Sequence, residues 1–160
     1  SAEGRAASGS VAPNFSINRA ARRSIITCRS ASVASVTTAR VDLPELPLAQ
    51  IDRLLVSRAL TNVIENALHA MPKGGSLRFS SPPSDPPGMV TLSVTDTGVG
   101  MDAAALARIF EPYFSTKTTG TGLGLTIAQR NVAANGGRIQ VEAEPGVGTT
   151  VTMAFPVAAA

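Results

Sequence analysis

Four polar side chains recur along one face of a predicted helix in the middle of the chain. At about 100° per residue, the segment 59–72 (ALTNVIENALHAMP) places its apolar residues on one side. The other side carries Asn62, Glu65, Asn66 and His69. Asn is a poor helix former because its side chain competes with the backbone for hydrogen bonds, so two Asn one turn apart suggest a binding role. The alternative is an ordinary solvated helix face.

A carboxylate and two glycines follow directly after a predicted strand, in the sequence DTGVG. Asp96 at a strand end can accept a hydrogen bond from an exocyclic amine. Gly98 and Gly100 beside it can let a flat ligand approach the backbone without a Cβ in the way. The pattern D-x-G-x-G is common, so a plain turn remains the alternative.

A second glycine-rich stretch, GTGLGL at 120–125, opens a second predicted helix. Gly120, Gly122 and Gly124 leave several N–H groups able to point at one place, where a helix N-terminus adds partial positive charge. Such an arrangement can bind phosphate. The stretch does not match the G-x-x-x-x-G-K-[ST] loop, and no strand leads directly into it as in a dinucleotide-binding fold. The alternative is that the glycines are there to allow close packing of the helix.

The composition indicates one globular domain. The 160 residues are 44% hydrophobic and 16% charged, without an apolar run long enough to span a bilayer or a secretory signal. Residues 1–40 contain six Arg and one acid, a net charge of +5, whereas residues 41–160 contain eight basic and ten acidic groups, a net charge of −2. Nucleic-acid binding is therefore not expected of the domain. One Cys (Cys28) and one His argue against a structural zinc site, and a cytoplasmic setting fits best.

The elements that would position these residues alternate between strands and helices. We expect residues 1–31 to form a flexible leader or linker and residues 32–160 to form the domain, although 24–29 is also β-branched and reads as a strand. The remaining strands are expected at 35–41, 77–80, 89–94, 138–143 and 149–155, and the helices at 52–71, 102–109 and 121–135. The predicted fold class is α+β, a two-layer sandwich with a mixed sheet and its helices on one face.

Taken in order, these motifs resemble the catalytic, ATP-binding domain of sensor histidine kinases. NVIENA resembles the N box of that family, DTGVG its first glycine box, IFEPYFSTK its F box and GTGLGL its second glycine box. The same superfamily includes DNA gyrase, mismatch-repair ATPases and heat-shock chaperones. The resemblance covers about residues 36–156, and the wording of the F box is most similar to the nitrogen-regulation type.

The resemblance implies a role for each motif, with ATP and Mg²⁺ as cofactors. Asn66 would be the magnesium ligand with Asn62 near the same phosphates, and Asp96 would accept from the adenine amine. Lys117 would reach the terminal phosphates from a mobile lid at 116–120. The other residues implied to contact the nucleotide are Gly98, Gly100, Phe110, Gly120, Thr121, Gly122, Leu123, Gly124, Leu125 and Thr149.

Two positions leave the mechanism open. In hydrolytic relatives the general base stands one turn before the magnesium Asn, where this chain has Asn62, which cannot take a proton at neutral pH. Glu65 directly precedes Asn66, so it is either a catalytic group or a solvated carboxylate. His69 lies inside the same helix and is followed by Ala70 instead of an acid, so it does not match a phosphoacceptor.

The resemblance also implies partners. We expect a catalytic domain that serves a dimerisation and phosphoacceptor domain outside this chain and, through it, a response regulator, without nucleic-acid or direct membrane contact. One rival is an ATPase clamp of the gyrase or mismatch-repair kind, against which Asn62 and the short lid argue. The other is a non-catalytic nucleotide sensor or an anti-sigma kinase, against which Phe110, Phe114 and Lys117 argue.

Overall fold

The computed structural model describes residues 23–29, 36–84, 87–115 and 121–158. Its strands are β1 (Arg23–Arg29), β2 (Val36–Asp42), β3 (Gly75–Ser80), β4 (Met89–Asp96), β5 (Arg138–Glu144) and β6 (Gly148–Pro156). Its helices are α1 (Arg53–Ala70), α2 (Ala103–Leu106) and α3 (Gly124–Ala134). Every element expected from the sequence is present, with ends that differ by a few residues.

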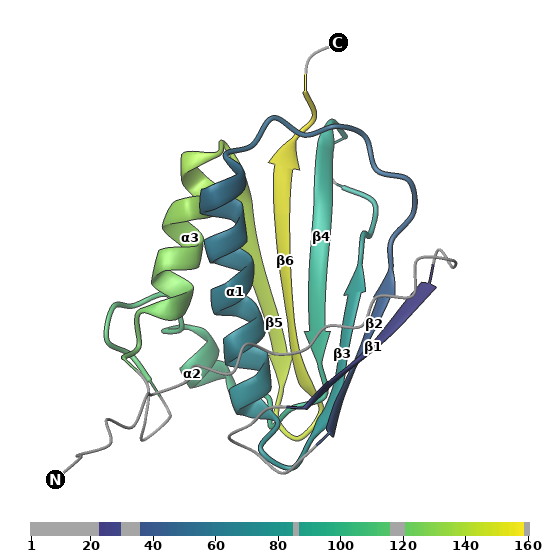
Figure 1. Cartoon of the computed structure of the whole chain (residues 1–160). Helices are drawn as coiled ribbons and strands as arrows, with labels where there is room; N and C mark the ends of the chain where they lie inside the picture. Colours follow the sequence, from purple (N-terminus) through teal and green to yellow (C-terminus); the bar gives the residue numbers. More distant parts are fainter. Residues whose placement is uncertain (1–22, 30–35, 85–86, 116–120, 159–160) are drawn as a thin grey trace, which may run out of the picture.

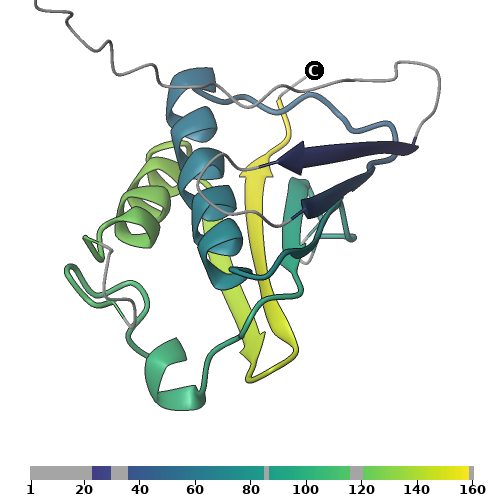
Figure 2. The ribbon, with the colours of Figure 1, turned by 60° about the horizontal axis from the view of Figure 1, so that its bottom comes forward.

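The strands form one mixed sheet in the order β1-β2-β3-β4-β6-β5. Only β2 and β3 are parallel to each other, and all other neighbours are antiparallel. Figure 1 shows α1 and α3 side by side on one face of this sheet, and Figure 2 shows α2 standing apart at the lower end. The predicted two-layer α+β sandwich with helices on one face is therefore confirmed.

Strand β1 corrects the expected extent of the leader. Arg23–Arg29 pairs with β2 along its whole length, whereas the sequence alone assigns these residues to a leader of residues 1–31. Its sequence RSIITCR is rich in β-branched residues, which favour an extended chain on a pleated surface. Residues 1–22 and 30–35 lie outside the described part of the chain.

The core lies between α1, α3 and the sheet. Along α1 the buried residues are Val56, Ala59, Val63 and Ala67, spaced by three or four. They meet Val132 of α3 and alternate residues of the central strands β4 and β6, among which Val94 and Met153 are fully buried. The apolar face of the predicted helix is thus confirmed as the face that packs on the sheet.

Helix α1 begins where its sequence predicts. The carboxylate of Asp52 accepts hydrogen bonds from the backbone N–H groups of Leu54 and Leu55, at 2.9 and 3.1 Å. These bonds satisfy two of the donors that a helix start leaves without partners. The backbone N–H of Asp52 donates to the side-chain Oδ1 of Asn135 at the end of α3, so the start of α1 is tied to the end of α3.

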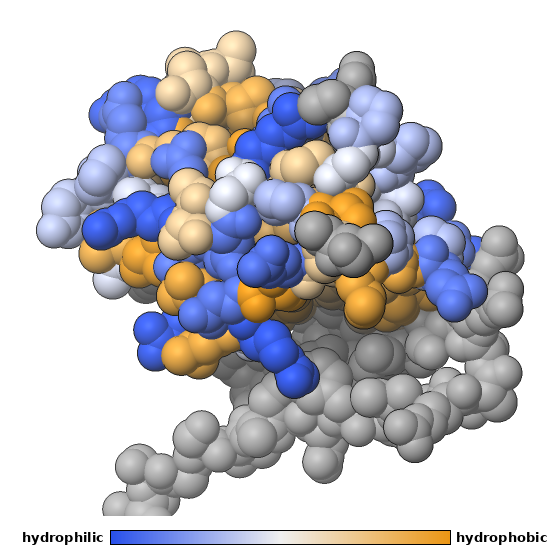
Figure 3. Space-filling model, turned by 90° about the horizontal axis from the view of Figure 1, so that it is seen from above, coloured by the Kyte–Doolittle hydropathy of each residue, from blue (hydrophilic) through white to orange (hydrophobic). Residues whose placement is uncertain are grey.

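The upper end of the molecule, where α1 begins and β6 ends, has a mixed surface. Apolar and hydrophilic side chains are interspersed there, so the described surface on this side offers no continuous apolar face (Figure 3). No helix among the described residues is long and apolar enough to cross a bilayer.

The connection after β4 packs tightly against the turn between β5 and β6. The backbone N–H of Gly146 in that turn donates to the carbonyl of Val99 at 2.8 Å. Gly100 has a φ of 67°, and a Cβ added to it would fall on the carbonyl oxygen of Glu144. Gly146 has a similar φ of 76°, but a Cβ there would meet nothing within 4 Å.

This pair of glycines separates backbone strain from steric overlap. Gly146→Ala should lower the free energy of unfolding by about 1–2 kcal/mol, the cost of a left-handed non-glycine residue. Gly100→Ala should cost a further ~1–3 kcal/mol, because the added methyl group must displace the β5–β6 turn. Denaturant unfolding of the two variants measures the difference. Equal losses would contradict the close approach at Gly100.

Candidate functional site

A cavity of about 310 Å³ opens at the end of the molecule where α1 and β4 finish and α3 begins. It contains most of the residues that the sequence singled out. Those that line it are Asn62, Glu65, Asn66, Asp96, Gly100, Thr121, Gly122, Gly124, Leu125 and Thr149. The residues come from four separated stretches of the chain, so the fold has assembled them.

Helix α1 supplies one wall of the cavity with its polar face. Asn62, Glu65, Asn66 and His69 all line it, while the opposite face of the helix is buried in the core. The carboxylate of Glu65 is exposed at the same wall as the two amides. The sequence left open whether this face was merely solvated, and the structure shows that it borders a cavity.

Asp96 lies at the inner end of the cavity. Only 6% of its surface is exposed, and its Oδ1 accepts a hydrogen bond from the backbone N–H of Gly98 at 2.8 Å. Thr149 on β6 is its direct partner across the β4–β6 pair, and both residues line the cavity. Because directly opposed side chains of antiparallel strands project to the same face, Thr149 stands beside the carboxylate. The motif DTGVG and Thr149 therefore meet at one point.

The two glycines after Asp96 face protein atoms. An added Cβ at Gly98 would come within 2.7 Å of the carbonyl oxygen of Ala70, at the end of α1. The next residue, Val99, donates its backbone N–H to that same carbonyl at 3.0 Å. Gly98 does not line the cavity, whereas Gly100 does. Their small size is accounted for by internal packing, a constraint that the sequence analysis did not include.

The start of α3 faces the two amides of α1. Its N-cap residue, Leu123, makes no side-chain cap hydrogen bond. An added Cβ at Gly124 would lie 3.6 Å from Nδ2 of Asn66 and 3.8 Å from Oδ1 of Asn62. The helix N-terminus, with its partial positive charge, is therefore in the same part of the cavity as the two carboxamides.

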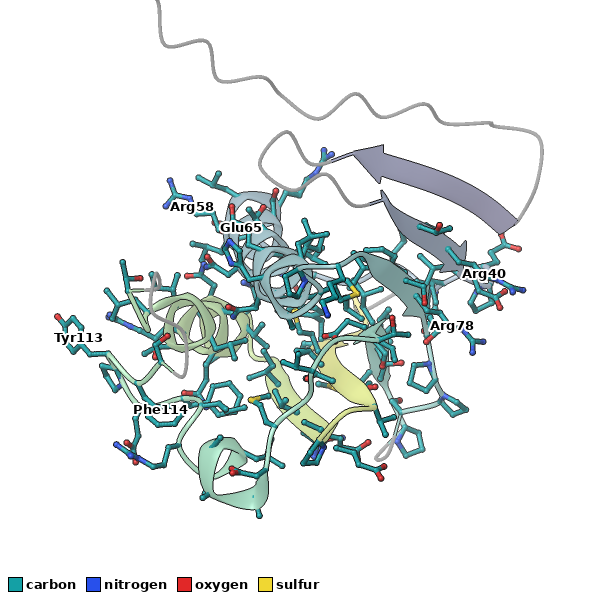
Figure 4. All side chains as sticks on the ribbon, turned by 90° about the horizontal axis from the view of Figure 1, so that it is seen from below. Arg40, Arg58, Glu65, Arg78, Tyr113 and Phe114 are labelled. Atoms are coloured by element: carbon teal, nitrogen blue, oxygen red, sulfur yellow. The ribbon has the colours of Figure 1, made fainter. Side chains whose placement is uncertain are left out.

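Phe114 lines the cavity and Phe110 does not, which differs from the expectation that Phe110 is the contact. The carbonyl of Phe110 instead accepts a hydrogen bond from Oγ1 of Thr126 on α3, at 3.1 Å. Figure 4 shows Phe114 between α2 and α3 and Tyr113 pointing away from the molecule. The sequence analysis also missed other lining residues, among them Met101, Ile109 and Ser115. The aromatic composition of FEPYF was the only signal, and it could not say which ring turns inward.

A left-handed residue explains the change of direction in FEPYF. Tyr113 has a φ of 64°, which is rare for a residue other than glycine, and 78% of its surface is exposed. Its backbone N–H donates to the carbonyl of Gly122 at 3.0 Å. Gly122 also has a positive φ, and an added Cβ would come within 2.8 Å of backbone atoms of Tyr113 and Phe114. These two residues form a tight backbone contact beside the cavity.

Three other predicted site residues are not placed in the cavity. Leu123 is described by the structure but does not line it. Lys117 and Gly120, and with them the expected mobile lid at 116–120, lie outside the described residues.

The donor set of the described cavity suits a hard cation shared with a ligand. Within the described ranges, no group of three or more His, Cys, Asp or Glu side chains could hold a metal ion. The carboxamides of Asn62 and Asn66 lie beside the start of α3, and a carboxamide oxygen is a neutral ligand of the kind that Mg²⁺ accepts when phosphate oxygens and waters complete its shell.

The chain belongs to the family of histidine kinase-, DNA gyrase B- and HSP90-like ATPases, whose model matches residues 51–159. Membership of this ATPase family implies that the domain binds ATP. Its relatives within the family are sensor histidine kinases. It is 34% identical over 148 residues to the signal transduction histidine-protein kinase AtoS of Escherichia coli K12, covering 89% of this chain and 23% of AtoS.

Solved structures agree with this relationship. The mycobacterial sensor histidine kinase MprB superposes with a TM-score of 0.64 and 30% identity, covering 74% of this chain and 80% of that one. Full-length ShkA in complex with AMPPNP gives a TM-score of 0.59 and 35% identity, covering 75% of this chain and 27% of ShkA. The chain thus corresponds to the ATPase domain of such kinases and spans only a quarter or less of the length of the curated relatives.

The position of Asp96 yields a binding prediction. Asp96→Ala should weaken ATP binding about 10- to 150-fold, because a hydrogen bond to a charged acceptor contributes roughly 1.5–3 kcal/mol. Calorimetric titration with an ATP analogue measures the change. Circular dichroism must show a folded variant, since Asp96 also accepts from Gly98. An unchanged dissociation constant in a folded variant would remove Asp96 from the binding site.

Proposed function

We propose that this chain is the ATP-binding catalytic domain of a two-component sensor histidine kinase. It delivers the γ-phosphoryl group of ATP to a histidine on a dimerisation domain, from which the group passes to a response regulator. The observation that carries this proposal is the convergence of Asn62, Asn66, Asp96 and Thr149 on one cavity beside the start of α3. The family match and the AMPPNP named in the structure of ShkA support the choice of nucleotide.

The inner end of the cavity suits the adenine base. The carboxylate of Asp96 is buried and held in place by the N–H of Gly98, so its position is fixed before a ligand arrives. Such a carboxylate can accept a hydrogen bond from an exocyclic amine. The hydroxyl of Thr149 lies beside the carboxylate. The apolar residues Met101, Ile109 and Leu125 offer contact surface for a flat ring.

The opposite end suits the phosphates. Gly124 places the start of α3 next to Asn62 and Asn66 with no side chain between them, and Gly122 lines the same cavity, so backbone N–H groups of the helix start would be available to phosphate. Asn66, with Asn62 beside it, would hold Mg²⁺ through carboxamide oxygens. The ion, when bound, neutralises phosphate charge during transfer. Lys117 and Gly120 are further candidates for this end from the part of the chain that is not described.

The chain's own residues bind and orient the nucleotide. An amide at position 62 cannot accept a proton, which disfavours activation of a water molecule and therefore disfavours the gyrase-like alternative. Glu65 places a carboxylate at the same wall, and a part for Glu65 in the transfer step remains a prediction.

Sustained ATP hydrolysis lost on substitution of Asn62 would favour the ATPase clamp instead. Binding of a sigma factor would favour the non-catalytic alternative.

The acceptor is expected on another domain. The sequence has one His, and His69 lies in α1 on the cavity wall next to Asn62 and Asn66. A residue on that helix cannot turn to face the terminal phosphate without moving the two amides. The domain would act in the cytoplasm, where ATP is available.

Asn66→Ala should distinguish metal-dependent from metal-independent binding. Because Asn66 is proposed to contact the ion and not the base, affinity for the magnesium–ATP complex should fall by about tenfold or more, whereas affinity for ATP in EDTA should change little. Titrations with and without magnesium measure both constants. Equal losses under the two conditions would contradict the assignment.

The chain alone should bind ATP without labelling itself. Incubation with γ-labelled ATP should give no acid-labile, base-stable label on the chain, because transfer needs an acceptor nitrogen in line with the terminal phosphate. A matched dimerisation domain with an exposed His should become labelled when added. Strong acid-labile labelling of the chain alone that is lost in His69→Gln would make His69 the acceptor.

A further inference from the structure

An arginine side chain lies over the ring of an aromatic residue that lines the cavity. Phe114 lines the cavity, and the guanidinium carbon Cζ of Arg108 lies 4.4 Å from the centroid of its ring. At this distance a cation is attracted to the negative face of an aromatic ring. The guanidinium of Arg108 is therefore stacked on the ring of a residue that lines the cavity.

Glu111 fixes the arginine in this place. Nε of Arg108 donates to Oε2 of Glu111 at 2.8 Å, three residues further along the chain. The two side chains are about half exposed, 56% for Arg108 and 52% for Glu111. An exposed ion pair of this kind contributes little to stability. Its evident consequence is geometric, because it limits the rotamers of Arg108 to those that lie over the ring.

The backbone of Phe114 is held as well. Its N–H donates to the carbonyl of Glu111 at 3.2 Å, and the neighbouring N–H of Tyr113 donates to Gly122. The left-handed turn at Tyr113 directs Phe114 inward while Tyr113 points to solvent (Figure 4). The backbone thus sets the direction of the side chain, but the turn of the ring about its own bonds is still free to vary. Among the described contacts, the one that bears on the face of this ring is Arg108.

We propose that Arg108 is a positioning residue for nucleotide binding, which acts by holding the ring of Phe114 as a fixed wall of the cavity. This inference rests on the proposed function, since it takes the nucleotide as the ligand. Arg108 does not line the cavity itself, so its effect must pass through Phe114. The energetic benefit is pre-organisation. If the side chain of Phe114 already has the rotamer that it adopts in the complex, no entropy is lost in ordering it when the ligand enters.

The test is a double-mutant cycle on nucleotide affinity in the full chain. Arg108→Met keeps a flexible, unbranched apolar stem and removes the guanidinium with its charge. It should weaken binding of an ATP analogue by roughly two- to tenfold, as expected for loss of a half-exposed cation–aromatic contact. In the Phe114→Ala background the same substitution should have no further effect, since its target is gone. Arg108→Lys should recover most of the affinity, because an ammonium also attracts the ring.

A charge-matched control separates this effect from a change in overall potential. Arg78 is similarly exposed, with 60% of its side chain accessible. It is on β3 and lies far from Phe114 (Figure 4). Arg78→Met removes one positive charge and should leave affinity unchanged. Melting temperatures check that every variant is folded. If Phe114→Ala does not fold, Phe114→Leu takes its place in the cycle.

The outcomes are distinct. Failure of the wild-type chain to bind the analogue would overturn the proposed function and this inference with it. If the wild type binds, an unchanged affinity in Arg108→Met would overturn this inference alone. This inference would also be overturned if Arg108→Met lowered the affinity equally in the wild-type background and in the Phe114→Ala background. Arg108 would then act independently of the ring.

Discussion

Close backbone packing around the end of β4 is the constraint on which the site depends. The turn after Asp96 is bonded to the end of α1 on one side and to the β5–β6 turn on the other, with glycines where side chains would collide. Three segments that are distant in sequence are thereby held at one place. Because the carboxylate of Asp96 is at the centre of this packing, its position is determined by the fold and does not depend on a ligand.

Helix α1 links the stability of the domain to the chemistry of the cavity. One face supplies Val56, Ala59, Val63 and Ala67 to the core, and the other supplies the polar wall. A rotation of the helix that moved Asn66 would also withdraw apolar side chains from the sheet. Since interiors are close-packed, such a rotation is strongly opposed. The amides therefore gain rigidity from hydrophobic contacts on the far side of the same helix.

Local patterns predicted what local forces determine. The cap at Asp52, the two faces of α1 and the end of β4 at Asp96 follow from periodicity and from residues adjacent in sequence, and the structure has them as expected. The inward ring at Phe114 could not be predicted, because it depends on a left-handed residue in an irregular segment and on a contact with Gly122. Likewise, the sequence showed that Gly98 and Gly100 were unusual but not that their neighbours would be other parts of the chain.

The pairing of Asp96 with Thr149 has a consequence for how the domain forms. Contacts such as this one and that between Asp52 and Asn135, 83 residues apart, raise the contact order of the fold. During synthesis, the central strand β4 emerges long before β6, its neighbour in the sheet. Until β6 follows, the apolar face of α1 has only part of the sheet to cover it, which is the condition in which nascent chains aggregate or recruit chaperones. The cavity and the core are thus completed together, once β6 has been synthesised.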